Sequence, residues 1–193
     1  MTEGASWLWQ FAADRGFRYE PDVDDRWLRL WEPFATLKTP ARYEHALYST
    51  GTLRSLTIAR FVVSLGATEA SAWVAIAQDE RLLDATAAAT SDAARVFTDE
   101  VVQLPRQVTQ DKDFGRAFAS YAPTEEQLRL AFTPSLRKLL LGWRAPVHVE
   151  LRKGGFILLP VALGFDARAL AWLVQAVYLL GEKAAKRESS SRA

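Results

Sequence analysis

Acidic side chains stand close together near the start of the chain, in the run Asp22-Val23-Asp24-Asp25. Hard divalent cations such as Mg²⁺ and Ca²⁺ prefer several oxygen ligands, so Asp22, Asp24 and Asp25 are candidate metal ligands. The same acids precede Trp27, where a helix is expected to begin and where carboxylates cap free backbone N–H groups and complement the helix dipole. We favour capping over metal binding.

Other catalytic patterns are sparse. The chain has no Cys, which excludes thiol chemistry, and its two His residues, His45 and His148, are far apart in sequence. We expect each His to be a partly exposed cross-strand partner rather than a catalytic base. No Ser stands in a nucleophile elbow, and no Gly-rich spacing resembles a phosphate loop. These observations disfavour an enzyme, and no cofactor is expected.

Charge and hydropathy indicate whether the protein binds nucleic acid or spans a membrane. Lys and Arg number 24 against 23 Asp and Glu, so no global field draws the chain to nucleic acid. The longest apolar run, 169–180, is shorter than the ~20 residues that span a bilayer, and no signal peptide is apparent. We expect a soluble, cytoplasmic protein without a transmembrane segment, with peripheral membrane contact by the basic C-terminal region as a minor alternative.

Aromatic residues supply the main indication of binding. The chain has seven Trp, and Trp is enriched at the energetic centres of protein interfaces. Those near the N-terminus are the candidate interaction residues: Trp7, Trp9, Trp27 and Trp31. Packing in the core is the alternative role for each of them.

The first half of the chain predicts helices followed by strands. Helical spacing covers 6–15 and 24–31. Short runs of β-branched and aromatic residues within 41–48, 56–65, 72–78 and 96–104 predict strands. A helical reading of 53–95 stays open, and the Ala-rich stretch 82–95 suits a helix or a mobile loop.

The second half carries clearer signals. Thr124-Glu125-Glu126-Gln127 has the form of a capping box, and Thr133-Pro134 repeats a helix start, so two helices should meet at a bend within 124–143. Strict alternation over 147–151 and a turn at Lys153-Gly154-Gly155 predict a hairpin over 147–159. Asp166 then caps a C-terminal helix.

These elements predict an α+β fold: a largely antiparallel meander sheet with N-terminal helices, the two-helix bend, the hairpin and the final helix. A mostly helical fold is the alternative. The chain length fits a single domain, which we place at 1–181, followed by a polar tail at 182–193.

Some local patterns resemble a group of uncharacterised bacterial proteins, of which some are membrane-attached. The similar parts are Gly16-Phe17-Arg18-Tyr19 after the first helix, the region 114–134 followed by Leu139-Leu140, and the 147–159 hairpin. The resemblance implies an α+β domain with a largely antiparallel sheet and flanking helices. It supplies no reaction and no catalytic residues.

The sequence therefore favours a non-catalytic interaction protein or accessory subunit, with a protein partner or a homo-oligomer. One alternative is a small carboxylate-dependent or Mg²⁺-dependent enzyme or ligand-binding protein that uses the acids near residue 22. A second alternative is an immunity-type inhibitor that forms one tight complex with a partner protein.

Overall fold

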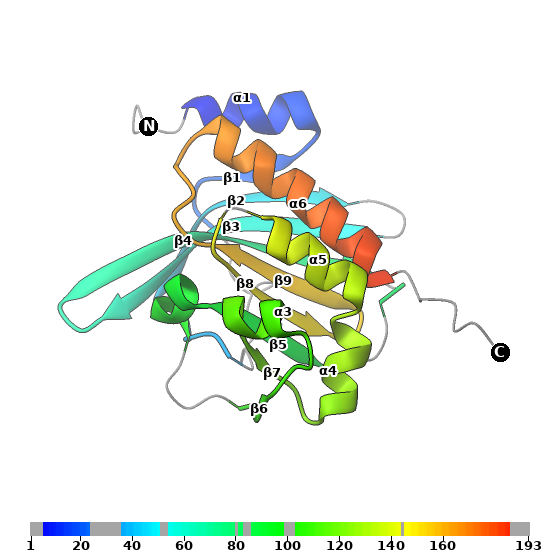
Figure 1. Cartoon of the computed structure of the whole chain (residues 1–193). Helices are drawn as coiled ribbons and strands as arrows, with labels where there is room; N and C mark the ends of the chain where they lie inside the picture. The colour runs from blue at the N-terminus through cyan, green and yellow to red at the C-terminus, as the bar shows by residue number, and fades with distance from the viewer. Residues whose placement is uncertain are drawn as a thin grey trace.

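An antiparallel sheet forms the centre of the molecule (Figure 1). The computed structural model describes residues 6–23, 36–50, 54–79, 81–82, 86–98, 103–143 and 145–185. Within these ranges the sheet has nine strands, in the order β1-β2-β3-β4-β9-β8-β5-β7-β6. The strands are β1 (Arg18–Glu20), β2 (Arg42–Thr50), β3 (Arg54–Leu65), β4 (Thr68–Asp79), β5 (Ala87–Ser91), β6 (Arg106–Gln107), β7 (Phe118–Tyr121), β8 (Val147–Arg152) and β9 (Gly155–Pro160).

The predicted meander is β2–β3–β4, to which the unpredicted strand β1 adds at the edge of β2, and the predicted hairpin is β8–β9. Gly154 turns this hairpin with a φ of +69°, a value that Gly adopts without steric penalty. β9 then pairs with the C-terminal part of β4, which joins the hairpin to the meander. The α+β prediction is confirmed, and the helical alternative for 53–95 is wrong over 54–65, 68–79 and 87–91, which are strands.

The Ala-rich stretch contains a strand rather than the helix or mobile loop that we expected. β5 lies between β8 and β7, and its residues 87–90 are buried. Small side chains suit this position because a helix packs closely over the strand. A 3₁₀ helix, η2 (Asp92–Phe97), follows β5, so the strand predicted over 96–104 does not begin at Val96.

The α-helices cover one face of the sheet (Figure 1). They are α1 (Ser6–Arg15), α3 (Lys112–Ala117), α4 (Glu125–Ala131), α5 (Pro134–Gly142) and α6 (Ala167–Ala185). Three predicted caps are confirmed: the side chains of Thr124, Thr133 and Asp166 accept hydrogen bonds from the backbone N–H three residues later. The predicted second helix, 24–31, lies outside the described residues.

The two faces of the sheet carry separate hydrophobic cores. Along β9, Phe156 and Leu158 point to the helical side, whereas Ile157 and Leu159 point to the opposite side, as the period of two in a strand requires. On that opposite side η2 closes the core through Phe97, whose ring lies 6.2 Å from the ring of Phe61. β9 is therefore buried on both faces.

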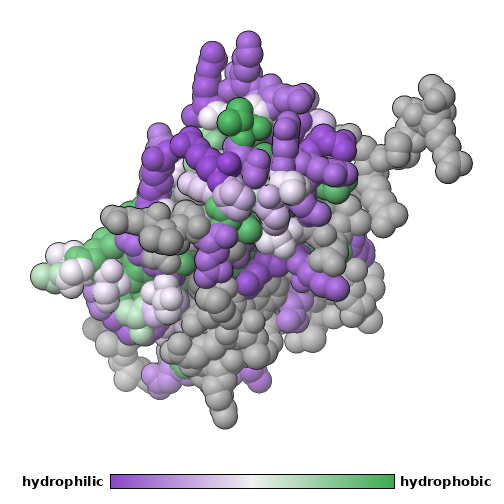
Figure 2. All heavy atoms as spheres, turned by 90° about the horizontal axis from the view of Figure 1, so that it is seen from below, coloured by the Kyte–Doolittle hydropathy of each residue, from purple (hydrophilic) through white to green (hydrophobic). Residues whose placement is uncertain are grey.

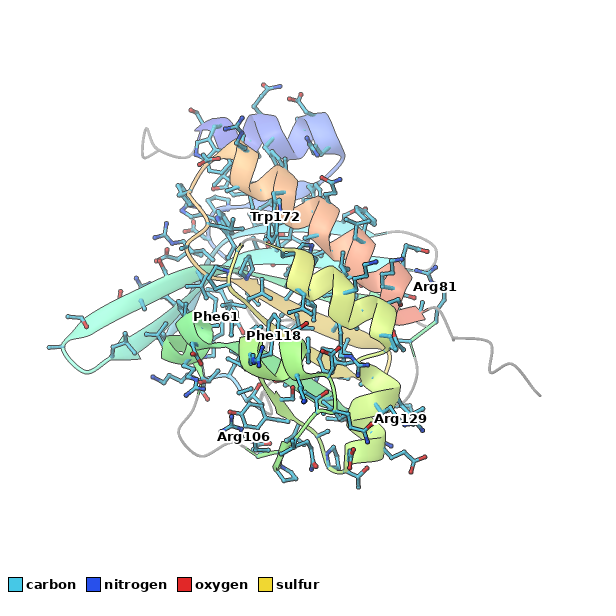
Figure 3. All side chains as sticks on the ribbon, in the orientation of Figure 1. Phe61, Arg81, Arg106, Phe118, Arg129 and Trp172 are labelled. Atoms are coloured by element: carbon cyan, nitrogen blue, oxygen red, sulfur yellow. The ribbon has the colours of Figure 1, made fainter. Side chains whose placement is uncertain are left out.

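The end of α6 is fixed to the sheet. Arg81 donates to the buried Asp79 at 2.7 Å and to Glu182 of α6 at 3.1 Å, and it lies beside the last turns of α6 in Figure 3. These hydrogen bonds raise the pKa of Arg81 above its ordinary value. The helix continues to Ala185, past Gly181, where we expected the domain to end. In the described part of the chain, no helix has the length and apolarity needed to span a membrane.

Candidate interaction surface

Aromatic side chains from distant parts of the chain converge where α1, the first strands and the loop before α6 meet. We call this group the Phe165 cluster. It consists of Trp7 and Trp9 from α1, Tyr19 from β1, His45 from β2, Arg60 from β3, Trp73 from β4 and Phe165 from the loop.

Phe165 is held on several sides. Its ring stacks on that of Trp73, with centroids 5.4 Å apart and planes within 1°, and the ring of Trp7 meets it edge-on at 5.2 Å. The guanidinium of Arg60 lies 4.9 Å from its centroid, within cation–π range. The indole of Trp73 also donates to the carbonyl of Gly164 at 3.2 Å. Phe165 nevertheless remains 36% exposed, so a fixed aromatic ring faces solvent.

Trp9 is the second exposed ring of the cluster. It is 53% exposed, and its ring meets that of the buried Tyr19 edge-on at 4.9 Å. The Tyr19 hydroxyl and His45 Nδ1 share a hydrogen bond of 2.8 Å. His45 lies 5.4 Å from Phe165 between ring centroids, so the Tyr19–His45 pair connects the two exposed rings.

His45 occupies an unusual backbone position. Its φ is +53°, in the left-handed region that residues other than Gly seldom adopt. The register of β2 against β3 shifts between Glu44 and Leu47, which is a β-bulge. A bulge redirects side chains, and here His45 is half-buried in the cluster instead of being the simple cross-strand partner that we expected.

The cluster favours neutral forms of both polar rings. Burial lowers the pKa of His45, and the charge of Arg60 adds to this effect, while Glu44 and Asp22 oppose it. Burial, together with the charge of Asp22, raises the pKa of Tyr19. Their hydrogen bond therefore joins two uncharged groups at neutral pH.

This shift predicts a pH dependence of stability. Because the native pKa of His45 lies below the ordinary value of about 6.5, the native state favours the neutral ring. That contribution is fully present above about pH 6.5 and is lost as the pH falls through the native pKa. We therefore expect the free energy of unfolding of the wild type, measured with urea, to fall relative to that of His45→Asn as the pH is lowered from about 7 to about 5. Asn tolerates the left-handed backbone; a relative gain on acidification would contradict the assignment.

The sequence-predicted residues divide into two groups. Trp7 and Trp9 both belong to the cluster, whereas Trp27 and Trp31 lie outside the described residues. Asp22 is exposed beside β1 and acts on the cluster through its charge, and Asp24 and Asp25 again fall outside the described part. Among the residues that the structure describes, no three His, Asp or Glu side chains are grouped to hold a metal.

No local pattern in the sequence indicates the centre of the surface. Phe165 stands in a short segment between β9 and α6, and Trp73 stands in a strand, so neither has a local pattern that indicates an exposed cluster. The adjacent Gly164 and Asp166 indicate only a loop and a helix start. The partners of Phe165 come from four other elements, which only tertiary structure brings together.

His148 lies in a buried polar group instead of at the partly exposed position that we expected. His148 and Glu150 have no exposed surface. His148 Nδ1 shares a 2.8 Å hydrogen bond with Thr90 Oγ1, and Nε2 shares one of 3.1 Å with Thr36 Oγ1. Thr36 donates from its backbone N–H and its hydroxyl to Glu150 Oε2, at 3.2 and 3.0 Å. Because this group is closed to solvent, we assign it to the stability of the fold.

A second apolar surface lies between α1 and α6. It is a groove lined by Arg15, Ala171, Trp172, Val174, Gln175, Tyr178 and Leu179. Trp172, labelled on α6 in Figure 3, meets Trp143 edge-on at 5.6 Å. Tyr178 and Leu179 are 48% and 42% exposed. The helical side of the molecule therefore presents apolar side chains beyond the Phe165 cluster.

The fold defines an α+β protein with a long antiparallel sheet and helices on one face. This fold is similar to the crystal structure of the mycobacterial trehalose monomycolate transport factor A, TtfA. The similarity covers 95% of this chain and 95% of the TtfA chain, with a TM-score of 0.65 and 9% sequence identity. At this identity the likeness shows a shared fold alone. No protein-family model and no curated protein matches the chain.

Proposed function

We propose that this chain is a non-catalytic accessory protein that works by binding another protein through the Phe165 cluster. The exposed ring of Phe165 carries the proposal. It is fixed by Trp73, Trp7 and Arg60 and still faces solvent. Binding a partner therefore requires little additional ordering of this side chain, and preorganisation of this kind increases affinity.

The composition of the cluster supports the same role. Trp, Tyr and Arg are the residue types enriched among interface residues with large binding energies. Trp7 and Arg60 contact Phe165, and Tyr19 belongs to the same cluster through its contact with His45. The exposed Trp9 extends the apolar area on the side of α1. A partner with an apolar pocket for Phe165 and a polar rim that accepts hydrogen bonds from Arg60 would fit this surface.

The structural neighbour is consistent with an accessory role, since its name describes a transport factor. We extend to this chain only the general idea of a protein that assists a larger process through contacts. The alternatives from the sequence make different predictions. A Mg²⁺-dependent enzyme requires metal-dependent stabilisation, and an immunity-type inhibitor requires a single tight cognate complex.

Native mass spectrometry of the full chain, purified gently from its own host, tests the proposal. We expect the chain to be recovered with a second, different protein in a defined ratio. Recovery with a bound metal or small molecule and without a protein would contradict the proposal and favour the enzyme or ligand-binding alternative. A complex that contains copies of this chain alone would also contradict it, because the proposal requires a different partner.

A further inference from the structure

The groove between α1 and α6 is an apolar recess with a volume of about 570 Å³. Within it Val174 is buried and Trp172 is half-buried, whereas Tyr178 and Leu179 are exposed. Among the described residues that line the groove, Arg15 is the one charged side chain. The far end of the molecule differs: Figure 2, seen from below, shows mainly hydrophilic residues apart from the protruding hairpin of β3 and β4.

One stripe of α6 runs along this groove and has a cation at each end. Positions 168, 172, 175, 179 and 183 are three or four residues apart, so they share one face of the helix. Arg168 begins the stripe and Lys183 ends it, with Trp172 and Leu179 between them. At a rise of about 1.5 Å per residue the stripe is about 22 Å long, which matches a partner helix of about 15 residues.

The cations beside the groove have no acidic partner in the part of the chain that the structure describes. No ion pair joins Arg15, Arg168 or Lys183 to a carboxylate. Arg15 instead lies over the ring of Phe11, 5.1 Å from its centroid, where its guanidinium stays exposed. The rim of the groove is therefore positively charged.

The acids of the two helices do not offset this charge, because each of them already has a partner. On α1, Asp14 accepts a hydrogen bond of 2.6 Å from Gln10. On α6, Glu182 pairs with Arg81 at 3.1 Å. An acidic ligand would consequently meet cations that have no other ion pair to break.

We infer that this groove binds an acidic amphipathic helix of a partner protein. The apolar face of that helix would pack on Trp172 and Leu179, in the manner of other helices that bind in apolar grooves. Acidic side chains at its edges would lie near Arg15, Arg168 and Lys183. Such charge complementarity contributes mainly to specificity and to the rate of association.

The shape of the site favours a helix over a membrane surface. A recess between two helices accepts a rod, whereas a helix that binds a membrane inserts its apolar face into the bilayer interface. Here Val174 is 7% exposed, and Trp172 packs edge-on against Trp143, so much of the apolar area lies below the rim. The inference does not rest on the proposed function, because Phe165 does not line this groove.

Three fluorescein-labelled peptides of about 15 residues test the charge preference. They would share one Leu stripe and one hydrocarbon staple that keeps them helical, and would carry Glu, Gln or Lys at the flanking positions. Fluorescence anisotropy with the full chain should give a dissociation constant about tenfold lower for the Glu peptide than for the Gln peptide, and added salt should reduce this difference. Equal binding of these two peptides, or no binding of the Glu peptide, would overturn the inference.

Leu179→Asp tests whether the peptide occupies the groove. It places an acid in the apolar wall and should weaken binding of the Glu peptide at least about tenfold. Val108→Asp is the matched control, the same kind of change at an 86% exposed apolar residue outside the groove, and should bind as wild type does. Phe165→Ala should also bind the peptide normally, which keeps this test separate from that of the proposed function. Equal effects of the two Asp variants would overturn the inference.

A charge-reversed variant, Arg15→Glu/Arg168→Glu/Lys183→Glu, tests the role of the cations. We expect its preference to be inverted, so that it binds the Lys peptide and no longer the Glu peptide. A misfolded chain would not gain this binding. A variant that still prefers the Glu peptide would overturn the inference.

Two other occupants of the groove give different results. If the chain sedimented with vesicles of phosphatidylglycerol and phosphatidylcholine, lost that binding in Leu179→Asp and did not bind the Glu peptide, the occupant would be a membrane surface. If sedimentation equilibrium showed a wild-type dimer that Leu179→Asp dissociates, the occupant would be a second copy. Either result would overturn the inference.

Discussion

Glu150→Ala should destabilise the protein by about 3 kcal/mol. The carboxylate accepts both the backbone N–H and the hydroxyl of Thr36 on one oxygen, and Arg152 lies 3.5 Å from the other oxygen. Removing it leaves buried donors without this partner, and each such donor costs about 1–3 kcal/mol. Urea unfolding followed by Trp fluorescence measures the change.

Two comparison variants separate the loss of hydrogen bonds from other effects. Glu150→Gln retains a carbonyl oxygen in nearly the same place and should lose less stability than Glu150→Ala. Glu126→Ala changes an exposed acid in the first turn of α4 and should alter stability by less than about 1 kcal/mol. If Glu150→Ala matched Glu126→Ala, the polar group would not hold the Thr36 segment to the sheet.

Trp73→Ala should also cause a large loss, about 3–5 kcal/mol. Trp73 is 3% exposed, and truncation of a buried Trp or Phe to Ala leaves a cavity and a loss of this size. The change also removes the ring on which Phe165 stacks and the donor to the Gly164 carbonyl. The loop before α6 should consequently become more mobile, which amide hydrogen exchange would detect.

Trp73→Phe distinguishes the two contributions of this side chain. It keeps an aromatic ring beneath Phe165 but loses the N–H donor, so we expect a smaller loss, of about 1 kcal/mol from the hydrogen bond together with a repacking cost. A double-mutant cycle with Phe165→Ala should give a coupling of about 0.5–1.5 kcal/mol for the stacked rings. No coupling would show that Trp73 does not hold Phe165 in place.

Local signals predicted much of the fold. The caps at Thr124, Thr133 and Asp166 each bond to a backbone N–H three residues later, so these helix starts can be predicted from the local sequence. The β8–β9 hairpin can be predicted in the same way, because it depends on a turn and an alternating pattern. β5 was missed because Ala has a high helix propensity, whereas its state here is set by pairing with β7 and β8. The burial of His148 depends likewise on Thr36, which is 112 residues away in sequence.

The candidate surface was predictable only in part. Trp7 and Trp9 were identified from the type and number of aromatic residues, which indicate binding without indicating a place. Phe165 needed the contacts of four separate elements before it could be recognised as a fixed, exposed ring. Trp residues are also common in cores, and Trp73 is an example.

Partner recovery by variants at Phe165 tests the central claim most directly. The full chain, wild type or Phe165→Ala, would be affinity-purified from its own host and the co-purifying protein quantified by mass spectrometry. Val108→Ala is the matched control, because Val108 is 86% exposed and apolar but is not part of the cluster. Circular dichroism and urea unfolding would establish that both variants are folded.

The account predicts that Phe165→Ala lowers the recovery of the partner at least about tenfold, as expected for an interface residue worth 2 kcal/mol or more, while Val108→Ala recovers it as wild type does. Equal recovery by wild type and both variants would show that the partner binds elsewhere and would contradict the account. The absence of any partner from the wild-type protein would contradict it as well.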